Sequence, residues 1–418
     1  MLAKKRVSLD KQPGNSYKKP HKSPFCEKLT RFQEFYDGFL SRVEYRNPYM
    51  RIIDPTATPS VVKNGKKMIM LGSNNYLGLS NHPLVKEEAK KAIDVYGTGA
   101  CSSRICAGST SLHYKLENEL AEYKGTESAL LFPTGYMTMM GTISGLLDEN
   151  DIVLSDQLNH ASIIDGIRLS KAQTRIYEHN DMKSLEESLK TCPSDVNKLI
   201  VTDGIFSIKG DIANLPEIKS LAEKYGAFVM VDDAHGSGIM GEKGKGTLEH
   251  FHMEGQIDLV CCTFSKVFGA LGGFVGAKKE IINFLRFNSR PFLFTASPPP
   301  SVMSTVLACL RVMKNHPELL QKLRKNVKYL RENLKNLKFR LFPTETPIIP
   351  IIIGEEEKTF RMSIELEEEG VYVNPIIPPG VSAESSLIRV SVMATLSQKD
   401  LDTALDKFKL VGKRLRII

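Results

Sequence analysis

The chain has 418 residues, of which 42% are hydrophobic and 25% are charged. These values are ordinary for a globular protein of two or three domains, and they exclude a collagen-like, coiled-coil or largely disordered chain. No apolar run approaches the roughly 18 residues that a membrane-spanning helix needs, so a transmembrane protein is excluded as well.

The net charge of +8 is concentrated at the N-terminus. Residues 1–26 hold seven basic side chains and one acidic one, so the rest of the chain carries only +2. A nucleic-acid-binding protein is expected to place basic residues on a folded face beside aromatic ones, which argues against that class. We expect a disordered tail on a cytoplasmic protein, because the segment lacks both a secretory apolar core and an arginine-rich transit helix. Weak peripheral contact of the tail with an anionic membrane is the alternative.

The cysteines and histidines do not follow the spacing of a disulfide framework or a metal site. The sequence has seven cysteines without a C-x-x-C pair and nine histidines without an H-E-x-x-H motif. We therefore expect a reducing compartment and no bound metal.

The segment 27–65 predicts an N-terminal helical arm. Its apolar residues recur at steps of three and four, which is the spacing of one helix face: Leu29, Phe32, Tyr36, Phe39 and Val43. We expect this amphipathic helix to pack on the core.

From residue 66 to 297 short β-rich runs alternate with helical patterns. The predicted strands are 68–71, 129–132, 152–154, 199–201, 227–231 and 259–263, and the predicted helices lie near 83–95, 135–147, 160–170 and 215–225. Strands that are apolar on both faces and alternate with helices are typical of a mainly parallel sheet covered on both sides. We therefore predict a large α/β domain over 66–297.

The pattern changes after the run Ser-Pro-Pro-Pro at 297–300. A long Lys/Arg-rich helical stretch is followed by β-like runs, a helix, a strand and a closing helix, near 339–342, 348–353, 360–369, 387–390 and 398–411. These elements predict a smaller C-terminal α+β domain over 298–418.

Polar residues follow two of the predicted strands at the point where each strand ends. The buried run 228–231 leads directly into Asp232 and His235, and the strand ending at Thr263 is followed by Lys266. Ligands of open α/β sheets bind beyond the carboxyl ends of the strands. A carboxylate, an imidazole and a lysine gathered there are the groups that a pyridoxal phosphate site needs. Taken one at a time, each residue could equally be a turn cap, a loop histidine or a surface amine.

Two glycine-containing segments are candidate anion sites. Residues 236–241 spell G-x-G-x-x-G, but further glycines at 244 and 246 interrupt the helix that a dinucleotide site requires, so we expect only an irregular loop. Gly135 and Tyr136 lie between a predicted strand and a predicted helix, where free N–H groups suit a phosphate. A plain helix start is the alternative for this second segment.

Four motifs together resemble the α-oxoamine synthases. They are NNYLGL at 74–79, NHASI at 159–163, DDAH at 232–235 and TFSK at 263–266, the last followed by two glycines at 272 and 273. The resemblance covers nearly everything from about residue 30 to the C-terminus. It implies a fold-type I enzyme that uses pyridoxal phosphate to condense an amino acid with an acyl thioester, with loss of CO2.

The resemblance implies roles for the residues around the cofactor ring. Lys266 would form the Schiff base and later move the α-proton. Asp232 would pair with the ring nitrogen, while His235 and Ser207 would contact the ring hydroxyl. His160 would stack on the face of the ring and act in catalysis.

It also implies how the cofactor phosphate is held. Gly135, Tyr136 and Thr263 would bind this group. Thr295 would reach the phosphate of a neighbouring subunit, so a homodimer with shared active sites is implied.

The substrate residues implied by the family are Arg389, as a bidentate partner of the substrate carboxylate, and Asn74 beside it. The stretches 253–258, 263–266, 290–297 and 372–375 are most similar to bacterial serine palmitoyltransferases. That branch uses L-serine and a long-chain acyl-CoA or acyl carrier protein and yields a 3-ketosphinganine-type product. Two departures affect the substrate end: Leu396 replaces a histidine usual in the family, and the loop 379–382 before Arg389 is an uncommon version.

Other members of the family remain open alternatives. The first is 8-amino-7-oxononanoate synthase, which uses L-alanine and a pimeloyl thioester in biotin biosynthesis. Glycine C-acetyltransferase and 5-aminolevulinate synthase follow, and a catalytically silent partner subunit is the alternative that is not an enzyme.

Overall fold

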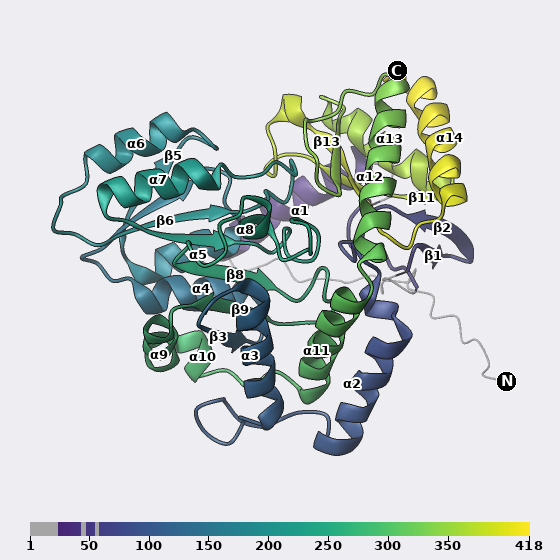
Figure 1. Cartoon of the computed structure of the whole chain (residues 1–418). Helices are drawn as coiled ribbons and strands as arrows, with labels where there is room; N and C mark the ends of the chain where they lie inside the picture. The colour runs from purple at the N-terminus through teal and green to yellow at the C-terminus, as the bar shows by residue number, and fades with distance from the viewer. Residues whose placement is uncertain (1–23, 43–46, 55–57) are drawn as a thin grey trace. The chain divides into compact units, whose positions relative to one another are not determined.

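The computed structural model describes residues 24–42, 47–54 and 58–418 (Figure 1). The predicted basic tail lies outside the described residues except for its last three, which begin helix α1 (Pro24–Arg42). The chain forms two compact units, Met1–Arg51 and Ile52–Ile418. The predicted helix of the arm is confirmed, with Phe32, Tyr36 and Phe39 stacked along it at centroid distances of 6.1 and 6.5 Å. Its packing on the core stays a prediction.

A seven-stranded sheet is the centre of the second unit. Its strands, in spatial order, are β3 (Ser128–Phe132), β9 (Gly273–Ala277), β8 (Leu259–Thr263), β7 (Phe228–Asp232), β6 (Lys198–Asp203), β4 (Ile152–Asp156) and β5 (Gln173–Tyr177). The five strands from β8 to β5 run parallel, whereas β9 is antiparallel to both of its neighbours. The expected mainly parallel sheet is thus confirmed, with β5 and β9 as strands that the sequence analysis did not anticipate.

Helices cover both faces of this sheet (Figure 1). Side chains that alternate along β6 and β7 enter two different cores, because Val201 and Met230 belong to one buried cluster and Ile200 and Val231 to the other. The first cluster is completed by α4 (Gly135–Leu146), α5 (Ala161–Ser170), α9 (Lys279–Asn288) and α10 (Arg290–Leu293). The second is completed by α6 (Met182–Lys190), α7 (Leu215–Tyr225) and α8 (Thr247–His250).

The C-terminal part contains a separate three-stranded antiparallel sheet. It consists of β10 (Ile348–Ile352), β13 (Leu387–Ser391) and β12 (Asn374–Ile376), with the helices α11 (Pro300–Asn315), α12 (Glu318–Asn336), α13 (Glu356–Glu368) and α14 (Gln398–Arg414) and the short turn η2 (Ala383–Ser385). The predicted strand at 339–342 is wrong. Only Leu341 forms a bridge there, to Ile351, because Phe339 turns into the core beside Phe408.

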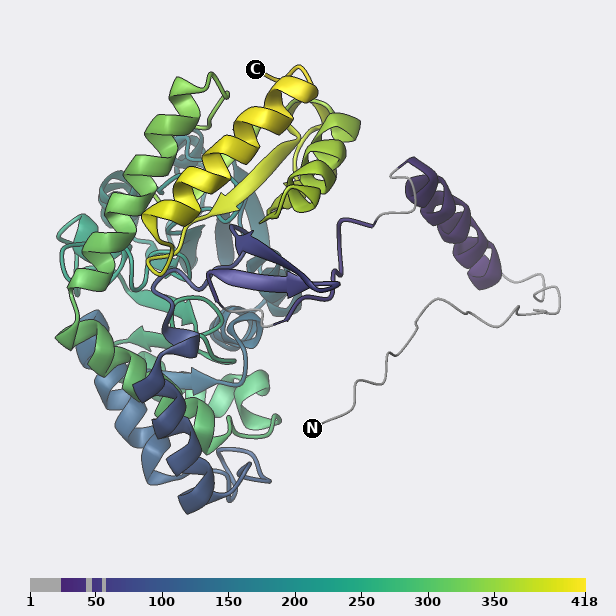
Figure 2. The ribbon, with the colours of Figure 1, turned by 90° about the vertical axis from the view of Figure 1, so that its right-hand side faces the viewer.

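A third sheet joins two distant parts of the chain (Figure 2). The hairpin of β1 (Ser60–Lys63) and β2 (Lys66–Met70) pairs through β2 with β11 (Val371–Tyr372) in parallel. After β2 the chain continues through η1 (Leu79–Asn81), α2 (Pro83–Tyr96) and α3 (Ser111–Lys124). The boundaries at 65 and 298 stay predictions, since all these elements belong to one compact unit.

The turn after β7 is fixed by a buried ion pair. Lys124, the last residue of α3, lies 2.5 Å from Asp233, and the two side chains are 1% and 0% exposed. Thr247 donates its backbone N–H and its hydroxyl to the same carboxylate, at 3.1 and 2.7 Å, and Ser237 adds a third bond at 3.0 Å. Every acceptor position of Asp233 is therefore used inside the protein.

We predict that Lys124→Met lowers the free energy of unfolding by about 3–5 kcal/mol, because it leaves Asp233 as an uncompensated buried charge. The measurement is the urea midpoint, taken under identical solution conditions for every variant. Lys91→Met is the matched control, since Lys91 forms an ion pair with Glu88 at 3.1 Å with 61% of its side chain exposed. Equal midpoints for the two variants would contradict the prediction.

Candidate active site

The ends of β6, β7 and β8 open onto a pocket of about 280 Å³. Eight of the predicted site residues line it, contributed by five separate loops: Gly135, Tyr136, His160, Ser207, Asp232, His235, Thr263 and Lys266. The structure therefore brings together residues that are spread over more than a hundred positions of the sequence.

Lys266 stands on a tight turn between β8 and β9. Phe264 and Phe268 on either side of it are fully buried, with their rings 5.6 Å apart, and they anchor the turn in the core. The backbone closes the turn through Phe264 N–H to the carbonyl of Gly272 at 2.8 Å. Lys266 itself lines the pocket. Burial lowers the pKa of its amine, although the carboxyl group of Asp232 acts in the other direction.

The adjacent acids Asp232 and Asp233 face different surroundings. Asp233 is held in the ion pair with Lys124, whereas Asp232 lines the pocket and accepts the N–H of Ala234 at 3.0 Å. Burial raises the pKa of Asp232 to about 6, and the positive charge of Lys266 works against that rise. A cation placed in the pocket would stabilise the ionised form of Asp232 further.

Two histidines from separate segments of the chain line the pocket: His160 precedes α5, and His235 follows β7. His235 is buried and its Nδ1 shares a hydrogen bond of 2.8 Å with the hydroxyl of Tyr76. His160 caps α5, with its Nδ1 2.8 Å from the hydroxyl of Ser162. Burial, followed by the charge of Lys266, lowers the pKa of both imidazoles, so that each is neutral at pH 7.

The first turn of α4 forms a cradle against Thr263. Thr134 caps the helix by accepting the N–H of Met137 at 3.0 Å, while the described hydrogen bonds include none from the N–H groups of Gly135 and Tyr136. A Cβ added to Gly135 would lie 2.4 Å from Thr263 Oγ1. Only glycine therefore allows Thr263 to lie this close to the positive end of the helix dipole.

The two predicted substrate residues contact each other beside the pocket. The Nη1 of buried Arg389 donates to Asn74 Oδ1 at 3.1 Å and to Ser391 Oγ at 2.9 Å. Its Nε donates to the carbonyl of Ser207, a pocket residue, at 2.6 Å. These bonds use Nε and Nη1, and the hydroxyl of Tyr76 is a further partner of the guanidinium.

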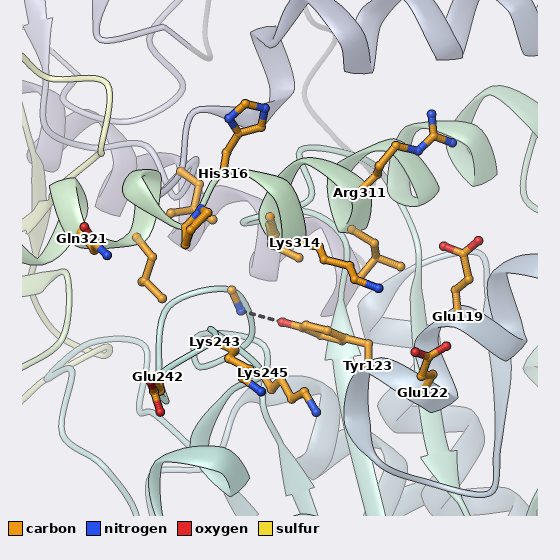
Figure 3. Close-up of a pocket in the computed structure, with 16 residues that line it drawn as sticks. Glu119, Glu122, Tyr123, Glu242, Lys243, Lys245, Arg311, Lys314, His316 and Gln321 are labelled. Carbon is orange, nitrogen blue, oxygen red and sulfur yellow. Dashed lines mark hydrogen bonds between the residues drawn. The ribbon is translucent and has the colours of Figure 1, made fainter.

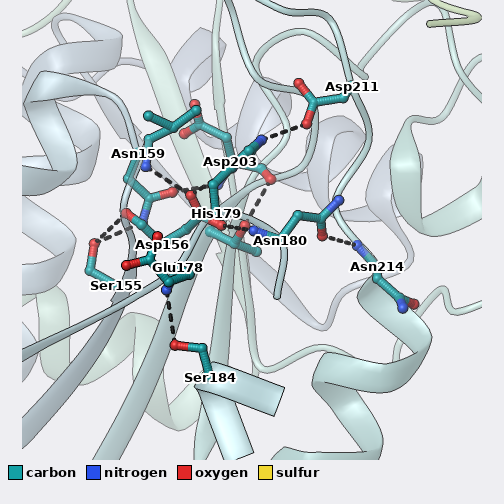
Figure 4. Close-up of polar contacts among 12 residues, drawn as sticks. Ser155, Asp156, Asn159, Glu178, His179, Asn180, Ser184, Asp203, Asp211 and Asn214 are labelled. Atoms are coloured by element: carbon teal, nitrogen blue, oxygen red, sulfur yellow. Dashed lines mark hydrogen bonds and ion pairs between the residues drawn. The ribbon is translucent and has the colours of Figure 1, made fainter. Parts of the chain in front are cut away.

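Asp203 is a pocket residue that the sequence analysis missed. It ends β6 directly beside Asp232 of β7 and is 4% exposed (Figure 4). Burial and the neighbouring Asp232 raise the pKa of its carboxyl well above the usual range. One oxygen has no hydrogen-bond partner among the described residues. The available signal was that β6, like β7, is an apolar run ending in aspartate.

Thr295 is the one predicted cofactor residue outside this pocket. Its role toward a neighbouring subunit stays a prediction. Leu396 is fully buried and its carbonyl accepts from Asn326 at 3.1 Å, so this departure from the family pattern lies in the core.

A larger cavity of about 850 Å³ lies elsewhere in the same unit (Figure 3). Among its described lining are the charged residues Lys243, Lys245 and Lys314 and, at its centre, Tyr123, whose hydroxyl accepts the N–H of Gly238 at 2.9 Å. None of the predicted site residues lines it. Size alone therefore does not identify the functional pocket.

Comparisons with known proteins agree with the chemistry of the smaller pocket. A family model described as aminotransferase class I and II matches residues 66–408. An 8-amino-7-oxononanoate synthase of Thermoanaerobacter pseudethanolicus is 45% identical over 88% of this chain and 94% of its own. A serine palmitoyltransferase of Bacteriovorax stolpii is also 45% identical, over 86% of both chains.

Solved structures extend the similarity to the fold. The serine palmitoyltransferase of S. paucimobilis, solved with a bound PLP–myriocin aldimine, superposes with a TM-score of 0.90 at 34% identity and covers 93% of this chain and 99% of that one. The fold is that of the fold-type I transferases, and the cofactor is pyridoxal phosphate. The chain belongs to the aminotransferase class I and II family and, within it, to the α-oxoamine synthases.

Proposed function

We propose that this enzyme condenses L-serine with a long-chain acyl thioester, carried by CoA or by an acyl carrier protein, and releases CO2 to give a 3-ketosphinganine-type amino ketone. The observation that carries the proposal is the arrangement of Lys266, Asp232 and His235 in one pocket with Arg389 and Asn74 beside it. Support for serine comes from similarity to enzymes named serine palmitoyltransferase, including the solved one at 34% identity.

An 8-amino-7-oxononanoate synthase is the second candidate. Relatives with that name reach the same 45% identity as the serine palmitoyltransferases. This activity would pair L-alanine with a pimeloyl thioester in the same pocket, so the two candidates differ in the amino acid and the acyl chain and share the reaction class.

The pocket residues fit pyridoxal phosphate. The N–H groups at the start of α4 suit the phosphate, and the close approach of Gly135 to Thr263 places the Thr263 hydroxyl beside them. Asp232 offers a buried carboxylate to a protonated ring nitrogen, and Ser207 and His235 line the wall where the ring hydroxyl would lie. When bound, the cofactor supplies an electron sink for the charge that develops at the α-carbon of the substrate.

In this proposal Lys266 carries out the covalent and proton-transfer steps, and other residues orient the substrate. We assign Lys266 to covalent attachment of the cofactor and to moving the α-proton with its Nζ, because a lowered pKa increases the unprotonated fraction of the amine. Arg389 would hold the substrate carboxylate with its guanidinium, which Asn74 and the carbonyl of Ser207 fix in place. Neutral His160 would cover the reacting face and donate a hydrogen bond.

We further propose that the enzyme works in the cytoplasm as a homodimer, with Thr295 completing the phosphate site of the partner. No helix in the described part of the chain has the length and apolar character to cross a membrane.

Lys266→Ala should remove the visible absorbance of protein-bound pyridoxal phosphate and lower turnover by at least about 10²–10⁴-fold, the range for loss of a general base. Circular dichroism should stay unchanged, because the turn is anchored by the flanking phenylalanines and the amine adds no packing. Lys278→Ala, on an exposed residue, is the control. Retained absorbance and turnover would refute the assignment of Lys266.

Arg389→Lys should raise the KM for the amino acid by about 10–100-fold, because a charge-assisted hydrogen bond is worth about 1.5–3 kcal/mol and lysine cannot also contact Ser207, Asn74 and Ser391 as the guanidinium does. The KM for the acyl thioester should change far less. Steady-state kinetics with each substrate varied in turn give both values. An unaltered KM for the amino acid would place the carboxylate site elsewhere.

Spectral titration of the yellow holoenzyme with L-serine, L-alanine and glycine should give a saturable change at the lowest concentration for serine. The physical reason is that each amino acid that occupies the Arg389 subsite changes the environment of the bound cofactor. A selective response to alanine would replace the serine proposal with the 8-amino-7-oxononanoate synthase.

A further inference from the structure

A histidine outside the pocket lies between two carboxylates (Figure 4). His179, in the turn between β5 and α6, has its Nδ1 3.0 Å from Asp156 and its Nε2 2.7 Å from Asp211. Its ring also stands edge-on to Phe206, with centroids 4.4 Å apart. His179 is therefore held on three sides by elements that are distant in the sequence.

This arrangement requires a charged ring. A neutral imidazole has one N–H and would donate to only one of the two carboxylates, whereas an imidazolium donates to both. Burial opposes the charge, but the hydrogen bonds to Asp156 and Asp211 outweigh it and raise the pKa of His179 to about 9. The neighbouring Asp181 is occupied as the cap of α6, where it accepts from the N–H of Lys183 at 2.9 Å.

Asp156, His179 and Asp211 together form a bridge between two loops. At one end, Asp156 holds the turn that leads to His160. Besides His179, Asp156 accepts the N–H groups of Leu158 and Asn180, both at 2.8 Å. Asn159 follows, and its side chain donates to the carbonyl of Val201 at 2.8 Å. Hydrogen bonds to Asp156 of β4 and to Val201 of β6 thus fix the backbone that leads into His160.

At the other end of the bridge, Asp211 holds the loop that contains Ser207. Asp211 receives His179 through its side chain, and its carbonyl accepts the N–H of Phe206 at 3.0 Å, which closes the loop 206–211. Within that loop the carbonyl of Ser207 accepts Nε of Arg389 at 2.6 Å. A displacement of Asp211 would therefore move the anchor of the predicted carboxylate-binding arginine.

We propose that His179 is a positioning residue of the active site, which acts as a charged bridge between the His160 turn and the Ser207 loop and so sets the place of Arg389. The proposal rests on the proposed function only in taking Arg389 as the residue that binds the amino-acid carboxylate. It assigns His179 no contact with substrate or cofactor.

The test compares His179→Gln and Asp211→Asn with His316→Gln in the holoenzyme. His316 is the matched control, because it also lies beside a carboxylate, that of Glu318 at 2.8 Å, but is exposed and does not line the pocket. Asp211→Asn keeps the shape of the side chain but removes the charge that pairs with the imidazolium, so it tests the charged bridge even if His179→Gln does not fold. The readouts are KM and kcat for whichever amino acid gives the spectral response, the Kd for pyridoxal phosphate, and an NMR titration of the histidine ring protons.

The expected result is a KM for the amino acid raised about tenfold in both bridge variants and a smaller rise in the Kd for the cofactor, because Asp232, Thr263 and the start of α4 are not part of the bridge. The ring resonance that disappears in His179→Gln should titrate near pH 9 in the unaltered protein, and His316→Gln should match the unaltered protein in all values. An unchanged KM in Asp211→Asn, an equal change in the control, or a rise in the cofactor Kd as large as the rise in KM would overturn the proposal. An error in the choice of serine would not affect this test, because the kinetics use the amino acid that responds.

Discussion

The site depends on two carboxyl groups and one amine being buried together at the ends of adjacent parallel strands. Asp203 and Asp232 are neighbours across β6 and β7, and Lys266 follows the end of β8. Their burial raises the pKa of each acid and lowers that of the amine, which makes the charges of all three sensitive to whatever occupies the pocket. A parallel sheet supplies this geometry without special loops, because its strands all end at one edge.

Rigidity around that edge comes from polar groups that do not face the pocket. Asp233 directs its carboxylate to Lys124 on the other side of the turn, so the chain that presents Asp232 is anchored by its immediate neighbour. His179 does the same for two further loops through Asp156 and Asp211. Catalytic geometry here is supported by buried charges in ion pairs, whose removal costs more than their formation contributes.

The parts of this arrangement that the sequence predicts are those encoded by local patterns. Apolar runs ending in Asp232 and Thr263 identify strands and their polar ends, and Gly135 after a strand identifies a helix start. Strands β5 and β9 escape the pattern, since β5 is an exposed edge strand and β9 contains two glycines. Asp203 ends an apolar run as Asp232 does, so a local signal for it exists. His179 escapes the pattern for a different reason, because its environment is created by residues far away in the chain and no local spacing reports it. The roles of the site residues themselves remain predictions.

The pairing of β2 with β11 and of Asn74 with Arg389 has a consequence for the order of assembly. The second pair is separated by 315 residues, so its contact forms only after nearly the whole chain has been synthesised. The strands that carry Asp232 and Lys266 are complete much earlier. On the ribosome, the part of the pocket around Asp232 and Lys266 is therefore complete before the contact between Asn74 and Arg389 can form, and contacts between distant segments are the slow step of folding.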